Sequence, residues 1–240
     1  MAPVARRLAD CFSVLEPLQR GSGSEPLTVA RHIRDLYEVV GRSGQRVAPA
    51  LVGSSWGAML ALAFACAHPD SAGPLVLIGC GTFDRESRDR FRLSIEQRMD
   101  ESVRHRLERL ENEVEDPDER LRAMAQLLLP VYSYELIAAG DETENYDSRA
   151  HRETWEDMLR LQDQGVYPAA FSAINAPVLM LHGTEDPHPG QMIRASLAPY
   201  IRQLEYLEWE RCGHYPWLER AVRERFFAVL RNWLERRLRQ

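Results

Sequence analysis

The stretch PALVGSSWGAMLALAFACAHP, residues 49–69, constrains the fold more than any other part of the chain. It begins with a short apolar run, passes through a turn that contains two glycines, and continues into AMLALAFACA (58–67). That last segment is apolar on every side of a helix, and a helix without a polar face has to be buried. The stretch therefore predicts a strand, a tight turn and a helix packed inside the molecule.

Short apolar runs alternate with amphipathic helical patterns along much of the chain. These runs carry little alternation of polar and apolar residues, which is typical of strands buried on both faces. We therefore predict an α/β fold in which helices sandwich a mostly parallel sheet. The predicted strands are CFSVLEPL (11–18), PALVG (49–53), GPLVLIG (73–79), APVLMLHG (176–183) and LEYLEW (204–209).

Residues 84–168 interrupt this alternation with a charged, helical sequence. An amphipathic helical insertion between two strands is typical of a lid over the end of a sheet, and the alternative is a solvated helical hairpin that only adds stability. We predict a core of residues 1–83 and 169–240 and a helical cap of residues 84–168. One apolar stripe along the insertion contains Phe91, Ile95, Met99, Val103 and Leu107.

Composition excludes several classes of protein. The chain has 240 residues, 45% of them hydrophobic, and its formal net charge is −6 with acids and bases interleaved, so we expect no nucleic-acid partner. No apolar run reaches the roughly 18 residues of a membrane span, and the N-terminus lacks the apolar region of a signal peptide. We expect a reduced, cytoplasmic protein without a metal, and the sequence indicates no particular oligomeric state. The cysteines lie too far apart for a metal cluster or a disulfide scaffold: Cys11, Cys66, Cys80 and Cys212.

Three polar side chains fall directly after predicted strands. Ser55 lies in GSSWG, where the turn would point its hydroxyl out of the sheet and the flanking glycines would avoid collisions with neighbouring backbone. Asp186 and His214 follow the next two predicted strands along the chain that come after the insertion. Because the carboxyl ends of parallel strands meet at one edge, we expect the three to converge as nucleophile, orienting carboxylate and base.

Other polar residues near these motifs have less specific interpretations. Glu185 is the alternative carboxylate, although the spacing from Gly183 favours Asp186. We expect His182 to form a local hydrogen bond at its strand end, and His188, between two prolines, to be a loop residue that could line the mouth of a pocket. The remaining histidines are predicted to lie at the surface: His32, His68, His105 and His151.

The motifs GSSWG, LHGTEDPHPG and CGHYPWLER resemble the nucleophile, acid and base motifs of the α/β-hydrolase superfamily. In having a tryptophan directly after the serine, the chain resembles the subgroup that contains the proline iminopeptidases. The resemblance covers residues 1–83 and 169–240. It implies that Ser55 is the nucleophile, His214 the general base and Asp186 its orienting group, with the backbone N–H of Trp56 as one oxyanion donor.

The resemblance also implies a substrate class. A small ester, amide or N-terminal aminoacyl compound would react through an acyl-enzyme, without a cofactor. In an iminopeptidase, acids in the cap hold the amine of a short peptide, and Glu142, Glu144 and Glu156 could serve here. A carboxylesterase or a carbon–carbon bond hydrolase is comparably plausible, and a catalytically impaired or non-catalytic binding protein on this fold is the rival from another class.

One family element has no counterpart in the sequence. Members of the superfamily usually begin with a hairpin and a strand that ends in a His-Gly loop, which supplies the second oxyanion N–H. The chain opens at APVARRLADCF, which resembles the helix after that loop, so we expect an N-terminally shortened core. Either the native enzyme is longer, which we favour because all three motifs are kept, or the chain is an impaired homologue. Loss of one oxyanion donor typically costs about 10²- to 10³-fold in kcat.

Overall fold

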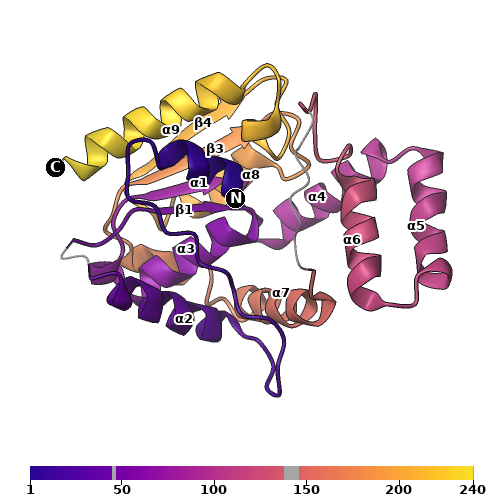
Figure 1. The fold of residues 1–240 in the computed structure, drawn as a ribbon, viewed down its shortest axis with the longest axis horizontal. Helices are drawn as coiled ribbons and strands as arrows, with labels where there is room; N and C mark the ends of the chain where they lie inside the picture. Colours follow the sequence, from indigo (N-terminus) through magenta and orange to yellow (C-terminus); the bar gives the residue numbers. More distant parts are fainter. Residues whose placement is uncertain (45–46, 138–145, 240) are drawn as a thin grey trace.

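The computed structural model describes residues 1–44, 47–137 and 146–239. Within these ranges, four strands form one parallel sheet in the order β1-β2-β3-β4 (Figure 1). The strands are β1 (Leu51–Ser54), β2 (Leu75–Ile78), β3 (Val178–Gly183) and β4 (Leu204–Trp209). Strands that follow one another in the chain are also neighbours in the sheet, so the turns after them gather at a single edge.

The two central strands are buried on both faces, as the sequence predicts, whereas β1 and β4 at the edges of the sheet are partly exposed. Successive side chains of a strand point to opposite faces, and in β2 and β3 they enter two separate cores. One core holds Leu75, Leu77, Val178 and Met180, and the other holds Val76, Ile78, Leu179 and Leu181. The predicted α/β sandwich is therefore confirmed.

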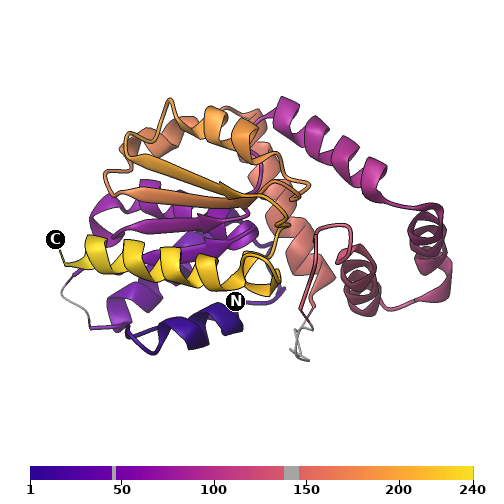
Figure 2. The same ribbon diagram turned by 90° about the horizontal axis from the view of Figure 1, so that it is seen from above.

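Helices cover both faces of the sheet. The first core is closed by α2 (Val29–Arg42), α3 (Trp56–Ala67) and α8 (Gly190–Leu197). The second is closed by α1 (Ala2–Leu8) and α9 (Arg223–Leu238), which lie along one side of the sheet (Figure 2). Every residue from Ala58 to Ala65 in α3 is buried, which confirms the central position predicted for that helix. Short 3-10 turns occupy η1 (Pro69–Ser71), η2 (Ala169–Ala173) and η3 (Pro216–Leu218).

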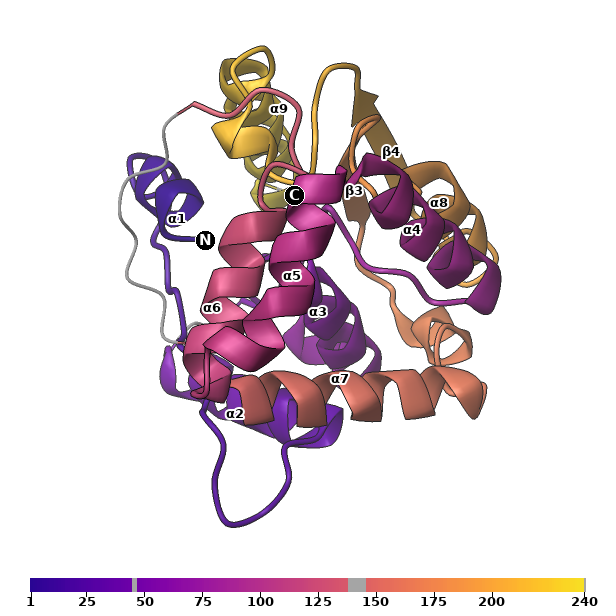
Figure 3. The same cartoon turned by 90° about the vertical axis from the view of Figure 1, so that its right-hand side faces the viewer.

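Residues 84–168 form a helical segment next to the sheet. It contains α4 (Arg85–Arg98), α5 (Glu101–Glu113), α6 (Pro117–Leu128) and α7 (Ser148–Asp163). Helices α4, α5 and α6 extend away from the sheet, whereas α7 runs beside α2 (Figures 1 and 3). Each of the four starts with an aspartate whose side chain accepts a hydrogen bond from a backbone N–H in the first turn, which stabilises the helix start. The predicted stripe is divided because Asp100 begins a new helix.

One predicted strand is wrong. In the part of the chain that the structure describes, residues 11–18 form no strand, and β1 is hydrogen-bonded only to β2. The segment does not pair with the free edge of β1, and Leu15 and Leu18 are 65% and 95% exposed instead of buried. Phe12 and Val14 still pack against the second core.

The surface position predicted for His32 is also wrong. His32 is 4% exposed, and its Nε2 lies 3.0 Å from Oγ1 of Thr154 on α7. Burial lowers the pKa of this imidazole. The contact joins residues 122 positions apart, because α7 covers the face of α2 on which His32 stands.

Candidate active site

Ser55 occupies a strained turn between β1 and α3. Its φ of 53° and ψ of −119° lie in a region that L residues rarely adopt. The backbone N–H of Ser55 donates to the carbonyl of Ile78 at 2.9 Å, which fixes the turn to the end of β2. A Cβ at Gly53 would lie 2.2 Å from the carbonyl oxygen of Gly57, so the turn requires glycine there. The same prediction for Gly57 is wrong, because among the described residues a Cβ there meets nothing within 4 Å.

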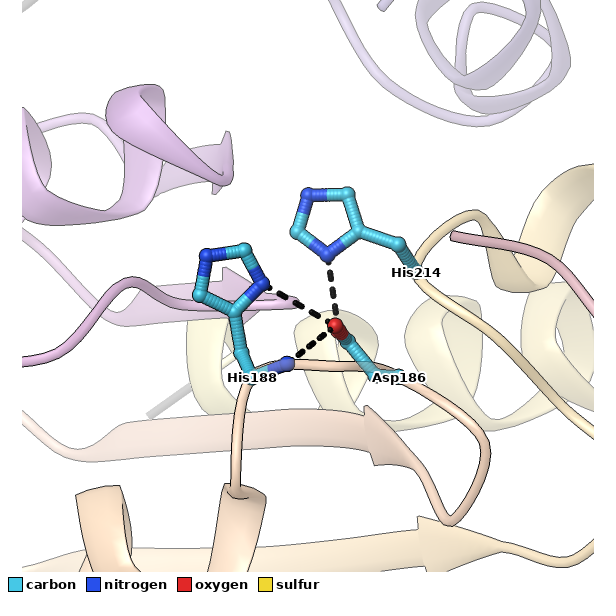
Figure 4. Close-up of side chains that lie close together, drawn as sticks. All are labelled: Asp186, His188 and His214. Carbon is cyan, nitrogen blue, oxygen red and sulfur yellow. Dashed lines mark hydrogen bonds and ion pairs between the residues drawn. The ribbon is translucent and has the colours of Figure 1, made fainter. Parts of the chain in front are cut away.

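Asp186 and His214 come together because the loops after β3 and β4 are joined by backbone hydrogen bonds. The N–H groups of Thr184 and Glu185 donate to the carbonyls of Trp209 and Cys212, each at 2.9 Å. The backbones are so close that a Cβ at Gly183 would lie 2.0 Å from the oxygen of Cys212. This approach brings Nδ1 of His214 to 2.7 Å from Oδ2 of Asp186, with both side chains buried (Figure 4). The predicted alternative, Glu185, makes no such contact in the described residues.

Two further histidines contact the same carboxylate. His188 places both its backbone N, at 2.9 Å, and its ring Nδ1, at 3.0 Å, on Oδ1 of Asp186 (Figure 4). His182 places Nε2 3.2 Å from Oδ2 and 3.1 Å from the carbonyl oxygen of His188. Both partners of that nitrogen are acceptors, so it carries a proton, and Nδ1 of His182 is buried with no hydrogen-bond partner among the described residues. The local hydrogen bond predicted for His182 is present.

Contacts with carboxylate oxygens also set the tautomers of the other two rings. Nδ1 of His214 and Nδ1 of His188 each face a carboxylate oxygen and therefore donate. In the neutral form of His214, Nε2 is then the nitrogen without a proton, which is the state that a general base requires.

The electrostatics of the cluster favour an ionised Asp186. Burial opposes ionisation, but attraction to the rings of His214, His182 and His188 outweighs it and holds the pKa of Asp186 well below its ordinary range. Burial also lowers the pKa of His188, against the opposing effect of Asp186. The cluster therefore holds one ionised carboxylate in contact with three imidazole rings.

His214 lies beside the turn that carries Ser55. A Cβ at Gly79 would be 2.8 Å from Nδ1 of His214, and Gly79 directly follows Ile78, the residue whose carbonyl accepts the N–H of Ser55. Among the described residues, no hydrogen bond joins the Ser55 hydroxyl to His214. Catalytic hydrogen bonds are often long in ligand-free proteins and shorten when substrate binds. The structure thus pairs Asp186 with His214 and places Ser55 on the adjacent turn.

A segment that follows α6 forms one wall of the site. The carbonyl of Tyr132 accepts the backbone N–H of His214 at 2.7 Å, and the ring of Tyr132 contacts that of His214 edge-on. Arg98, at the end of α4, donates to the carbonyls of Glu185 and Ser133 and so joins this segment to the Asp186 loop. Residues 84–168 therefore contribute directly to the surroundings of the Asp186–His214 pair.

Glu219 holds this wall in place and is a site residue that sequence reasoning missed. It is fully buried, and Oε1 accepts the backbone N–H groups of Gly213 and Tyr134 at 2.9 and 2.8 Å, while Oε2 accepts that of Glu135 at 2.7 Å. One carboxylate thus fixes the residue before His214 to the segment after α6. In the sequence, Glu219 precedes Arg220 next to a predicted loop, and nothing there distinguishes it from a surface residue.

The predicted substrate-binding residues have different positions. Trp56 is the first residue of α3, and its indole N–H donates to Gln19 at 3.0 Å. His188 lies within the cluster, whereas Glu156 is exposed on α7. Glu142 and Glu144 lie outside the described residues.

Asp186, His188 and His214 also have the residue types of a metal site, and their potential ligand atoms lie within 4.8 Å of one another. Their geometry fits a metal poorly. A metal binds an imidazole nitrogen in the ring plane at about 2.0–2.1 Å, but the rings of His188 and His214 are stacked at 4.8 Å with only 26° between their planes. A shared ion would lie out of at least one plane, while each Nδ1 already has its own carboxylate oxygen. The three residues fit a hydrogen-bonded cluster.

Comparisons with known proteins identify the family of the chain. The sequence profile of the alpha/beta hydrolase family matches residues 1–226, so the chain belongs to that family. No curated protein matches the sequence. Among the residues described, no helix is both long and apolar enough to traverse a bilayer.

Solved structures with the same fold share little sequence with this chain. An esterase from Thermogutta terrifontis has a TM-score of 0.62 at 22% identity, covering 98% of this chain and 84% of that one. A proline iminopeptidase from Mycobacterium smegmatis has a TM-score of 0.56 at 16% identity, with coverages of 87% and 72%. A monoacylglycerol lipase from Paleococcus ferrophilus has a TM-score of 0.56 at 16% identity, with coverages of 89% and 79%.

Proposed function

We propose that this protein is a serine hydrolase in which Ser55 is the nucleophile, His214 the general base and Asp186 the group that orients the base. The observation that carries the proposal is the buried Asp186–His214 pair, 2.7 Å apart, beside a serine held at a φ of 53°. A strained serine between a strand and a helix is typical of a nucleophile in this fold. The chain order of serine, aspartate and histidine fits the same motif.

In the proposed mechanism, Oγ of Ser55 attacks a substrate carbonyl and its proton passes to Nε2 of His214. Asp186 stabilises the imidazolium that forms, since its ionised carboxylate accepts a hydrogen bond from Nδ1–H and remains charged. The developing oxyanion lies near the N-terminus of α3, where the N–H of Trp56 is one donor. His214 then protonates the leaving group, and a water molecule that it deprotonates releases the acyl group from Ser55.

We propose a small ester, amide or N-terminal aminoacyl compound as substrate, with residues 84–168 acting as a cap. Phe91 on α4 and Tyr132 after α6 place aromatic rings against the histidine cluster, which favours a compact acyl group over an extended polymer. Proline-naphthylamide and short p-nitrophenyl esters test the two branches of this class. Hydrolysis of the amide but not the esters would identify aminopeptidase chemistry, and the reverse result would identify a carboxylesterase.

Labelling by a fluorophosphonate probe tests the nucleophile. In the wild-type protein, Oγ of Ser55 should displace fluoride from the probe and form a phosphonyl-serine. The Ser55→Ala variant should not react. Ser54→Ala is the matched control, because Ser54 is the neighbouring serine but belongs to β1. Labelling that survives Ser55→Ala, or is absent in the wild type, would contradict the proposal; the second result would favour a binding protein.

A further inference from the structure

His188 does more at the cluster than a loop residue between two prolines needs to do. Three of its polar atoms take part: the backbone N and ring Nδ1 contact Oδ1 of Asp186, and the carbonyl contacts Nε2 of His182. Its side chain is 11% exposed. His188 therefore contacts both the Asp186 carboxylate and the ring of His182.

The two oxygens of Asp186 have different partners. Oδ2 faces the rings of His214 and His182, at 2.7 and 3.2 Å. Oδ1 is held by the two groups of His188, and its ring supplies one of them. Without that ring, a single backbone N–H would hold Oδ1, and the carboxylate would be freer to rotate away from His214. Hydrogen bonds to a charged acceptor are the strong ones, so the ring contact has a substantial effect on the orientation of Asp186.

Aromatic stacking fixes the ring of His188 from both sides. One face lies against His214, at 4.8 Å between ring centroids and 26° between planes. The other partner is Phe91 of α4, at 4.2 Å and 20°. Phe91, His188 and His214 thus form a stack of three rings that extends from the helical segment to the proposed base.

We propose that His188 is a positioning residue: its ring Nδ1–H holds Oδ1 of Asp186 so that Oδ2 stays on His214, and Phe91 holds the ring in the orientation that this requires. The inference rests on the proposed function, because it assigns His188 a role in orienting the proposed base. It also makes helix α4 part of the apparatus that positions this base.

Three substitutions at His188 separate the hydrogen bond from the stack. His188→Ala removes both, His188→Phe keeps the stacked ring without the donor, and His188→Asn keeps a donor near the position of Nδ1 without the ring. We expect fluorophosphonate labelling to slow by about ten- to a hundredfold in the Ala and Phe variants, the loss expected for one hydrogen bond to a charged group. The Asn variant should recover most of the wild-type rate.

A second readout does not depend on catalysis. The Nδ1 proton of His214 in its bond to Asp186 should give a low-field NMR signal that exchanges slowly with water. This signal should broaden in His188→Ala and His188→Phe and persist in His188→Asn. Thermal melts of all variants show whether a change in rate reflects only a loss of folded protein.

Phe91 provides the final step of the test. Phe91→Ala should slow labelling in the wild-type background, but not further in the His188→Asn background, where no ring remains for it to orient. Additive effects in this double-mutant cycle would contradict the role given to Phe91.

The outcomes distinguish the two proposals. Wild-type labelling together with unchanged rates and NMR signals in all His188 variants would overturn the positioning role and leave the proposed function intact. Recovery by Phe but not by Asn would also overturn it, because the stack and not the hydrogen bond would then matter. If the wild type is not labelled, the proposed function fails, and the NMR signals alone decide whether His188 holds Asp186 in place.

Discussion

Helices α3 and α5 show two different ways in which this chain uses a helix. In α3, eight consecutive residues from Ala58 to Ala65 are buried, and the helix begins at the strained turn of Ser55. In α5 no residue is fully buried, and the same is true of α6. Helix α3 is packed against the core on every side, whereas α5 and α6 are held by their capping residues and a few contacts.

This difference separates the part of the molecule that fixes the proposed chemistry from the part that contributes to its surroundings. Ser55, Asp186 and His214 all follow strands of the buried sheet, so their backbones are held by the core. The helical segment reaches the same place through single side chains such as Phe91, Arg98 and Tyr132. Binding residues on adaptable segments and reactive residues on rigid ones are a common division in enzymes.

The largest effect on the free energy of unfolding should come from removing a large side chain from the buried helix α3. Phe64 is 0% exposed within α3, so Phe64→Ala should lower the free energy of unfolding by about 3–5 kcal/mol through lost burial and a residual cavity. Leu107→Ala in α5, where no residue is fully buried, should cost about 1 kcal/mol or less. Urea denaturation measures both. Equal losses would show that the two helices are packed alike, against the comparison made above.

A smaller effect should come from Glu219, where the core and the helical segment meet. In Glu219→Gln an amide N–H replaces one oxygen and faces a backbone donor. The variant should lose about 1.5–3 kcal/mol of stability and label more slowly, because Gly213 and the segment after α6 are no longer held together. Glu135→Gln is the matched control, since the side chain of Glu135 is 44% exposed and only its backbone contacts Glu219. That control should change stability by less than about 0.5 kcal/mol. If Glu219→Gln matched this control in stability and labelling rate, the proposal that one buried carboxylate holds the wall of the site would be wrong.

The sequence predicted the sheet after residue 48 well, and its two central strands, buried on both faces, leave continuous apolar runs. It also predicted that Asp186 and His214 would meet, since both follow neighbouring parallel strands. It failed for residues 11–18, an apolar run that does not pair with the free edge of β1 in the described residues. An apolar run therefore does not by itself show that a segment pairs in the sheet.

Residues whose surroundings come from distant parts of the chain were not predictable. His32 is buried by α7, which lies more than a hundred residues further along, and Glu219 binds backbone groups 84 and 85 residues away. His188 stands in an ordinary loop sequence and becomes significant only because β4 brings His214 beside it. Local patterns report which residues are buried in strands and helices, but they do not report which loops meet.

The smallest effect concerns the attachment of α7 to the residues before α2. Oε2 of Glu153 accepts the backbone N–H of Leu27 at 2.8 Å, and this bond, with the contact to Arg149, lowers the pKa of Glu153 from its ordinary value of 4.5. Because the folded-state pKa is the lower one, the stabilisation is complete above pH 4.5 and is lost as the pH falls through the folded value. Asp147, which accepts the N–H groups of Ala150 and Ser22, has a lowered pKa and should follow the same direction.

An NMR titration of the Leu27 amide measures this attachment directly. The amide shift should change with a midpoint below pH 4.5, as Glu153 takes up a proton and its bond to Leu27 weakens. In Glu153→Gln the side-chain oxygen can still accept the bond but cannot titrate, so this transition should disappear while the folded core is unaffected. A midpoint at or above pH 4.5, or a transition that persists in the Gln variant, would mean that the carboxylate does not hold this segment. The helical segment would then be joined to the core through its remaining contacts, among them the bond from the backbone N–H of Val29 to Asp157 and the His32–Thr154 contact.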